Sequence, residues 1–578
     1  MQTSHLRFVA ILFLLSCGEA DAPPPLDAED FTGLVHPTLA AHTAEFEKRV
    51  YRVTEGVHVA VGYALANSIL IEGDDGVIIV DVTGSVQTAR AVRAEFEKIT
   101  DKPIRALIYT HNHADHVFGG MGFFDGSVPA NVDIYAHETT EYYIDRVVGI
   151  LRPILSRRSA RMFGTHLEDG PEGLINDGIG RSLEIGPDST LGLLRPTRTF
   201  RDKLELEIAG VKLVLIHAPG ETNDQLFVWL PEKKTLLPGD NVYKAFPNLY
   251  TIRGTLYRDV LEWSRSLDKM RDLRPEHLVP SHTRPVSGAA KIEAILVAYR
   301  DAIQYVHDQT VRGMNRGLTP DELVQEVVLP PHLRDHPYLQ ELYGTVAWSV
   351  RSIFSGYLGW FDGDAAHLAR PSPEERAAGT IELAGGTEAV LAAARAAVDE
   401  KRFAWAAELA NHVIHSGGDA DAAKRLKARA LRELAHRSIS PNGRNYYLTQ
   451  ALELEGVIDV RARSIDETVL DTLRSIPIAN FMEAMTVNLD PKKSADTDTR
   501  LVFEFSDIDE RYELHIRRGV AALRHGDAPN PDIRVTVNSI VWKEIVVGFR
   551  NPAIAFASGD VEIEGGAIEL AKILSMFR

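Results

Sequence analysis

Hydrophobic and polar positions follow two alternating patterns over the first two-thirds of the chain, starting near Thr43. Short runs rich in β-branched residues, such as Val77–Val82 and Ile104–Thr110, are bounded by turn residues and predict buried strands. Between these runs, residues 86–99 carry apolar side chains at helical spacing. Further strand patterns follow within residues 211–240. Strands and helices that alternate in this way predict an α/β fold in which helices cover the sheets.

The pattern changes twice in the last third of the chain. Residues 381–456 are rich in Ala, Leu and Arg and predict two helical hairpins. Two such units are too few to form a solenoid alone, so we expect them to pack on the preceding domain or on a second subunit. The final hundred residues return to strand patterns and end in an amphipathic helix. We therefore predict an α/β domain over 43–370, an all-α domain over 371–465 and an α+β domain over 466–578.

The N-terminus has the pattern of a targeting signal. Arg7 precedes an apolar run, Phe8–Leu15, which is too short to span a membrane and is typical of a secretory signal. The sole cysteine, Cys17, follows this run and resembles the acylated cysteine of the bacterial lipoprotein lipobox. Alternatives are an ordinary signal peptide or a buried apolar segment. We predict a lipoprotein signal peptide at 1–17, a tether at 18–42 that is rich in Ala, Pro and Asp, and an exported, periplasmic protein anchored to the membrane.

Composition narrows the classes of function. The chain has 578 residues, with 63 Lys+Arg against 81 Asp+Glu and a net charge of −18. This balance argues against a nucleic-acid partner, which requires an excess of basic residues. The net negative charge of the chain repels an anionic substrate, which would therefore need a local positive site in order to bind. A single Cys excludes intrachain disulfides and a Cys-based zinc site.

The most informative motif is H-x-H-x-D-H, which comes directly after an apolar strand. It comprises His111, His113, Asp115 and His116. Four potential ligands within six residues of one loop can converge on a metal ion, and imidazole and carboxylate groups both suit zinc. We therefore predict a metal site on this loop.

With this motif and four other segments in order, the chain resembles the metallo-β-lactamase superfamily, whose fold is a four-layer αββα sandwich. The other matching segments are Asp81, His217–Glu221, Gly239–Asn241 and Ser281–His282. Glu221 stands where the common member of the superfamily has His, and a carboxylate there resembles the alkylsulfatase branch. Four more segments resemble that branch: Leu155–Gly164, Gly170–Gly180, Asn248–Gly254 and Gly356–Leu368. The order of the downstream domains also fits, a helical dimerisation domain followed by a sterol-carrier-protein-like domain.

The resemblance implies two Zn²⁺ per chain with seven ligands. One zinc would take His111, His113 and Glu221, the other would take Asp115, His116 and His282, and Asp240 would bridge them. Such a centre can polarise a sulfate oxygen and lower the pKa of a bound water. Glu221 in place of a neutral His would reduce the Lewis acidity of its zinc.

Substrate contacts are expected from residues near the predicted ligands. Arg253 is the candidate sulfate clamp, because a planar guanidinium pairs with two sulfate oxygens. Asn248 would donate to the same oxygens, and Asp115 is assigned to catalysis as well as to the metal. We interpret His217 as a residue that packs beside the ligands without binding metal. For His137 a structural role in the core is favoured over one in orienting a ligand.

These observations predict an alkylsulfatase that converts R–O–SO₃⁻ and water to an alcohol and sulfate and that forms a homodimer. Attack of water at sulfur or at carbon stays open, because the motifs do not distinguish them. One alternative is another hydrolase of the superfamily, acting on a β-lactam, lactone or thioester. The other is a lipid-binding lipoprotein without enzymatic activity, in which the C-terminal domain carries apolar chains.

Overall fold

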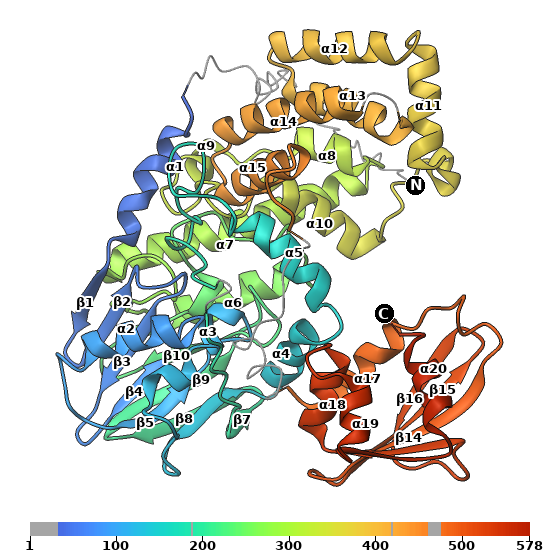
Figure 1. Ribbon diagram of the computed structural model, residues 1–578. Helices are drawn as coiled ribbons and strands as arrows, with labels where there is room; N and C mark the ends of the chain where they lie inside the picture. Colours follow the sequence, from blue (N-terminus) through green and yellow to red (C-terminus); the bar gives the residue numbers. More distant parts are fainter. Residues whose placement is uncertain (1–32, 186–188, 418–419, 461–475, 578) are drawn as a thin grey trace, which may run out of the picture.

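The computed structural model describes residues 33–185, 189–417, 420–460 and 476–577. The predicted signal peptide, Cys17 and the first part of the predicted tether lie outside this range. Among the described residues, no helix is both long and apolar enough to cross a membrane. Figure 1 shows a large α/β body, a layer of helices above it and a smaller C-terminal domain to one side.

Two sheets form the centre of the α/β body. The strands of the first are β1 (Arg49–Thr54), β2 (Val57–Val61), β3 (Ser68–Glu72), β4 (Val77–Val80), β5 (Ile104–Ile108), β6 (Asp133–His137) and β7 (Arg198–Phe200), in that spatial order. The second has the order β13-β12-β11-β10-β9-β8, with β8 (Lys203–Ile208), β9 (Val211–His217), β10 (Leu226–Leu230), β11 (Thr235–Leu237), β12 (His277–Leu278) and β13 (Val286–Ser287). In the first sheet the pairing is antiparallel from β1 to β4 and parallel from β4 to β7.

The alternation of side chains along the strands explains why the sheets are layered. On β4, Ile78 and Val80 pack between the two sheets, whereas Val77 and Ile79 pack on the opposite face. On β10, Val228 points into the layer between the sheets, while its neighbours pack on the helices of the other side. Because successive side chains of a strand point to opposite faces, a strand that is apolar throughout is buried on both sides.

Helices cover both outer faces. α2 (Val86–Phe96) packs on the first sheet and begins with a capping box between Ser85 and Thr88. α6 (Val260–Asp272), α7 (Ala289–Met314) and α10 (Val346–Leu358) pack on the second sheet. The remaining helices of this part are α1 (Pro37–His42), η1 (Thr43–Phe46), α3 (Ala114–Val117), η2 (Gly120–Phe123), α4 (Thr140–Val148), α5 (Arg152–Met162), η3 (Gly239–Asn241), α8 (Pro320–Glu326), α9 (Pro331–Arg334) and η4 (Ala365–Ala369). The layers thus confirm the predicted αββα sandwich.

The helical segment that follows packs on the α/β body. It comprises α11 (Pro373–Leu383), α12 (Thr387–Asp399), α13 (Phe403–Ser416), α14 (Ala420–Arg437) and α15 (Pro441–Leu454). α15 lies against α5, where the guanidinium of Arg161 makes two hydrogen bonds of 2.7 Å to the carboxylate of Glu453. At the start of α15, the buried Asn445 donates to the carboxylate of Asp177 over 3.0 Å.

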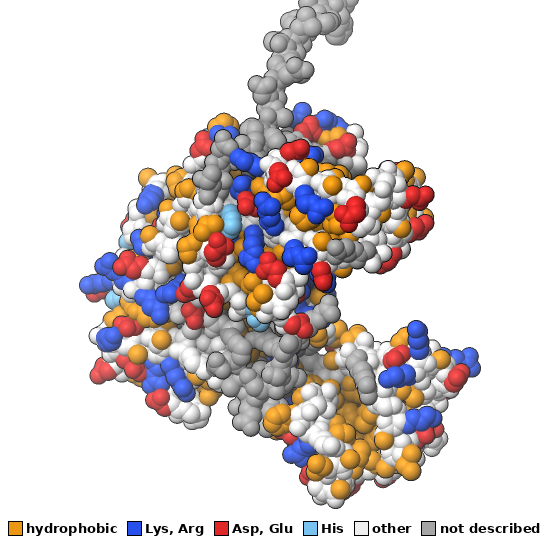
Figure 2. Space-filling model, turned by 45° about the horizontal axis from the view of Figure 1, so that its top comes forward, with side chains coloured by type: hydrophobic (Ala, Val, Ile, Leu, Met, Phe, Trp, Pro, Cys, Tyr) orange, Lys and Arg blue, Asp and Glu red, His pale blue; other side chains and the backbone are white. Residues whose placement is uncertain are grey.

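The C-terminal domain is a five-stranded sheet covered by helices, as the α+β prediction expects. The strand order is β16-β15-β14-β17-β18, with β14 (Asp498–Phe505), β15 (Glu510–Arg517), β16 (Val520–His525), β17 (Ile533–Val537) and β18 (Val561–Glu564). Its helices are α17 (Ile478–Val487), α18 (Ser539–Val546), α19 (Pro552–Ala557) and α20 (Ala567–Leu574), and the core centres on Phe503 and Trp542. Exposed apolar side chains include Phe549 and Ile554, and Figure 2 shows hydrophobic side chains gathered on this domain.

The domain boundaries predicted at 43, 371 and 466 stay predictions, as does the likeness of the last domain to a sterol carrier protein.

Candidate metal centre

The predicted ligands meet at one edge of the sandwich, where several strands end. The H-x-H-x-D-H loop follows β5 and turns into α3, while Glu221 comes after β9. Asp240 lies in η3 after β11, and His282 follows β12. Strands and loops distant in sequence thus bring their polar ends to the same place.

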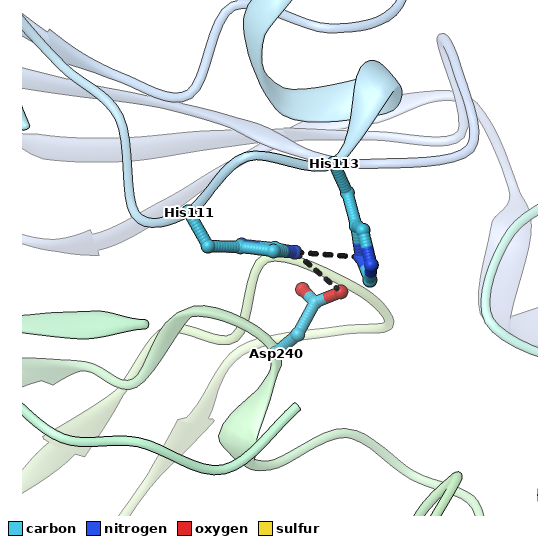
Figure 3. A group of neighbouring side chains, drawn as sticks. All are labelled: His111, His113 and Asp240. Atoms are coloured by element: carbon cyan, nitrogen blue, oxygen red, sulfur yellow. Dashed lines mark hydrogen bonds and ion pairs between the residues drawn. The ribbon is translucent and has the colours of Figure 1, made fainter. Parts of the chain in front are cut away.

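Two groups of potential metal ligands lie side by side. Within each, one ligand atom per residue lies within 4.8 Å of the others. The first group is His111, His113 and Asp240, and the second is Asp115, His116 and His282. In the first, His111 Nε2 is 2.9 Å from His113 Nδ1 and 3.6 Å from Asp240 Oδ2 (Figure 3).

Asp240 stands between the two groups. Its Oδ2 atom is 3.1 Å from His282 Nε2 and 3.4 Å from His116 Nε2. The same Oδ2 atom is 3.6 Å from His111 Nε2 of the first group. This is the position that the predicted bridging ligand requires.

The chemistry of these donors fits a metal ion. All are imidazole or carboxylate groups, which divalent metals such as zinc accept. Within the described residues, the buried atoms His116 Nε2 and Asp240 Oδ1 have no hydrogen-bond partner. Buried polar atoms are normally satisfied, so a ligand that both atoms face would account for them.

Charge states in the cluster follow from burial and from neighbouring carboxylates. Burial lowers the pKa of His111 to about 3, and His116 adds to the effect. For His116 burial acts in the same direction, but Asp240, Asp115 and Asp81 together raise its pKa well above the ordinary value. Burial disfavours the charged form of Asp240, yet three histidines, His282 first, hold its pKa well below the ordinary range.

Glu221, predicted as a ligand with His111 and His113, belongs to neither group. Its Oε1 atom is 2.7 Å from Arg258 Nη1, and both side chains are buried, with 2% and 3% exposed. Burial raises the pKa of Glu221 to about 7, although Arg258 opposes that shift. Its role as a metal ligand stays a prediction, as do the roles of the six other predicted ligands, the catalytic role of Asp115 and the substrate contacts of Asn248 and Arg253.

A buried carboxylate beside the cluster fixes the ligand loops. Asp81 accepts hydrogen bonds from the backbone N–H of Thr110 (2.9 Å), the Thr110 hydroxyl (2.9 Å), His116 Nδ1 (2.8 Å) and the Ser281 hydroxyl (2.7 Å). His116 therefore directs its Nε2 atom toward Asp115 and Asp240. A carboxylate that accepts from the far nitrogen of a ligand histidine sets its tautomer and orientation.

The backbone of Asp81 has a positive φ of 57°. Residues other than Gly rarely adopt this backbone conformation, but Asp and Asn tolerate it. The turn directs the carboxylate at the end of β4 toward the loop after β5. Sequence comparison with the superfamily pointed to Asp81, but its hydrogen bonds depend on the fold.

Another buried carboxylate, Asp224, lacks any motif in the sequence and was not predicted. It accepts from Asn112 Nδ2 at 2.5 Å and from the Thr140 hydroxyl at 2.9 Å, and so links the ligand loop to the start of α4. His217 and His137 stack with ring centroids 3.9 Å apart, and neither belongs to a ligand group. His217 Nε2 is 2.8 Å from the carbonyl of Asn223, which fits the packing role expected for it.

Arg253 and Asn248 lie close to the cluster. Arg253 Nη2 is 3.0 Å from His113 Nε2, and Arg253 is partly exposed. The side-chain amide of Asn248 is buried, and neither its Nδ2 nor its Oδ1 atom has a hydrogen-bond partner among the described residues. The α5 residue Arg158 donates twice to the carbonyl of Ile252, directly before Arg253 (2.6 and 3.1 Å).

The αββα layers and the His/Asp cluster define a protein of the metallo-β-lactamase superfamily. Residues 61–282 match that superfamily, residues 319–456 match the alkyl sulfatase dimerisation domain, and residues 467–578 match the alkyl sulfatase C-terminal domain. The chain belongs to the alkylsulfatase family.

Known relatives and solved structures agree with this assignment. A linear primary-alkylsulfatase of Pseudomonas sp. (strain ATCC 19151) is 41% identical over 88% of this chain and 98% of the relative. An (R)-specific secondary-alkylsulfatase of Pseudomonas sp. is 29% identical over 95% of this chain and 84% of the relative. The solved structure of a stereoselective inverting sec-alkylsulfatase from Pseudomonas sp. superimposes with a TM-score of 0.87 at 27% identity, covering 96% of this chain and 88% of the other.

We expect Asp81→Ala to weaken metal binding by roughly 10–100-fold, because His116 and the loop after β5 lose the acceptor that orients them. Asp81→Asn, which keeps the backbone conformation and part of the hydrogen bonding, should lose less. Bound metal is measured by elemental analysis and by competition with a chelator.

A matched control is Asp509→Ala, since Asp509 has a φ of 49° and lies far from the cluster in the loop between β14 and β15. Wild-type metal binding by Asp81→Ala would contradict the orienting role.

Proposed function

We propose that the protein is an alkylsulfatase that hydrolyses R–O–SO₃⁻ with water to an alcohol and hydrogensulfate at a centre of two Zn²⁺ ions. The observation that carries this proposal is the pair of adjacent ligand groups, in which Asp240 of the first lies 3.1 Å from His282 of the second, with Arg253 beside the first group. Kinship with alkylsulfatases over most of the chain supports the choice of substrate. Bound zinc would supply a Lewis acid that polarises the sulfate group.

The residues around the centre would bind and orient the anion. Arg253 presents a guanidinium fork next to His113, which suits two oxygens of a sulfate group. The unpartnered amide of Asn248 offers a further donor from a buried position. These local donors answer the problem set by the chain's net charge of −18, which otherwise repels an anionic substrate.

We infer that the protein acts as a homodimer through the segment that matches the dimerisation domain of alkyl sulfatases. The C-terminal domain, with its exposed apolar side chains, would hold the alkyl chain in the manner of a sterol carrier protein. A linear alkyl sulfate such as dodecyl sulfate suits this combination of a charged head site and an apolar domain.

The central test is metal-dependent release of sulfate. We expect the purified protein to release sulfate from dodecyl sulfate or from a secondary alkyl sulfate, to lose this activity after chelation, and to regain it with Zn²⁺. Inorganic sulfate is measured by ion chromatography, and zinc per chain by elemental analysis. Absence of metal-dependent release from both esters would refute the proposal, and faster turnover of nitrocefin would favour a β-lactam substrate.

For the anion site, we expect Arg253→Met to raise KM for dodecyl sulfate by about tenfold or more, because a charge-assisted contact of roughly 1.5–3 kcal/mol is lost. Arg253→Lys should recover only part of the affinity, since an ammonium group lacks the planar fork. Steady-state kinetics provide the measurement, and Arg265→Met, on the exposed face of α6, is the control. Equal KM values for Arg253→Met and the wild type would place the anion elsewhere.

We also propose that the chain is exported and anchored to the periplasmic face of a membrane through a lipid on Cys17. The apolar run before this sole cysteine supports the proposal. With expression in a bacterium that processes lipoproteins, we expect the wild type in the membrane fraction and labelled with a fatty-acid analogue. Cys17→Ala should lose both the label and the membrane association, and a variant that stays in the membrane would argue for another anchor.

A further inference from the structure

Arg258 is a buried arginine directly before α6, and no motif of the sequence singled it out. Its side chain is 2% exposed. Nη1 lies 2.7 Å from Oε1 of Glu221 and also donates to the backbone carbonyl of Asn248. A single guanidinium nitrogen thus connects a predicted metal ligand with the loop of the predicted sulfate contacts.

These contacts close a ring made of hydrogen bonds and one ion pair. Arg258 binds one oxygen of Glu221, and the hydroxyl of Tyr243 donates to the other oxygen over 3.4 Å. The Tyr243 hydroxyl in turn accepts from the backbone N–H of Asn248 over 2.9 Å. The backbone carbonyl of Asn248 accepts a hydrogen bond from Arg258, which completes the ring. Both oxygens of the Glu221 carboxylate are therefore held.

The ring is also tied to the bridging carboxylate. The backbone N–H of Glu221 donates to Oδ1 of Asn241 over 3.0 Å. Asn241 follows Asp240 directly in η3, and its Nδ2 atom donates to the carbonyl of Ala218 over 2.8 Å. These hydrogen bonds thus hold the loop after β9 and the loop after β11 in fixed positions relative to each other, beside the metal cluster.

The ion pair between Arg258 and Glu221 lacks the features expected of a contact that only stabilises the fold. Buried pairs often stabilise a fold no better than apolar residues of similar volume. Within the described residues, Nε and Nη2 of Arg258 have no hydrogen-bond partner. A structural role would be better served by a fully satisfied guanidinium, as in the two-bond contact of Arg161 with Glu453.

We propose that Arg258 is a positioning residue of the metal centre, which fixes the Glu221 carboxylate and the Asn248–Arg253 loop relative to each other. This inference rests on the proposed zinc-dependent function. The metal side and the anion side of the site are coupled through one guanidinium, and Arg258 itself does not have to touch the substrate.

The test measures Zn²⁺ affinity of the full chain by competition with a chelator, beside kcat and KM for dodecyl sulfate. We expect Arg258→Met to weaken zinc binding by roughly 10–100-fold, as loss of a partner that orients a ligand does. Arg258→Lys should also bind less tightly, because an ammonium group on a flexible stem is not held at the position from which Nη1 reaches both Glu221 and Asn248. KM should rise in both variants, since the Asn248 loop loses its anchor.

The control is Arg432→Met, which breaks a partly buried ion pair with Glu455 in the helical segment and should leave zinc affinity unchanged. A double-mutant cycle with Glu221→Gln separates positioning from general destabilisation. If Arg258 acts through Glu221, its substitution should cost much less zinc affinity in the Glu221→Gln background. Additive losses would overturn the proposal.

Two further outcomes would also overturn it. Zinc affinity in Arg258→Met equal to or tighter than that of the wild type would show that the guanidinium does not position a ligand. Wild-type affinity in Arg258→Lys would show that a positive charge suffices without the two fixed contacts of Nη1. Failure of the wild type itself to bind zinc or release sulfate would instead refute the proposed function, so the two failures are distinguishable.

Discussion

The carboxylate of Asp81 is the constraint on which the rest of the site depends. It accepts four hydrogen bonds from two segments, the loop after β5 (residues 110 and 116) and the loop after β12 (residue 281), and the second lies two hundred positions after Asp81 in the sequence. A buried charge of this kind is tolerated because each oxygen is satisfied. The same bonds position the loop after β5, the ring of His116 and the segment that ends at His282. The arrangement of these potential metal ligands thus depends on how one strand of the first sheet ends.

Around this anchor, the two sheets supply the rigidity that a metal centre needs. Their central strands are apolar on both faces, and the loops at one edge carry the polar groups. A site whose ligands come from the ends of packed strands is more precise than one built on free loops. Asp81 and Asp224 bind the loop after β5 from two sides, and Arg258 contacts the loop that carries Glu221.

The fold and the metal cluster were largely predictable from the sequence because their signals are local. Strand and helix periodicity predicted sheets covered by helices, the resemblance to the superfamily predicted the αββα layers, and the H-x-H-x-D-H motif placed four potential ligands within one loop. Asp240 and His282 required resemblance to a superfamily, since each is an ordinary residue beside Gly or Ser. Arg258 and Asp224 were missed because an isolated charge in a loop carries no pattern, and only the fold brings Arg258 to Glu221. The carboxylate of Glu221 turns toward that arginine, which residue order alone does not reveal.

Helix α5 contacts two separate parts of the molecule, the loop before Arg253 and helix α15, from successive turns. Arg158 holds the carbonyl that precedes Arg253, and Arg161 holds Glu453 on α15. The helix therefore connects the segment that matches the dimerisation domain with the loop of Arg253. The position of that loop depends in part on a helix outside the two sheets, so a shift of α15 would be passed to Arg253 through α5.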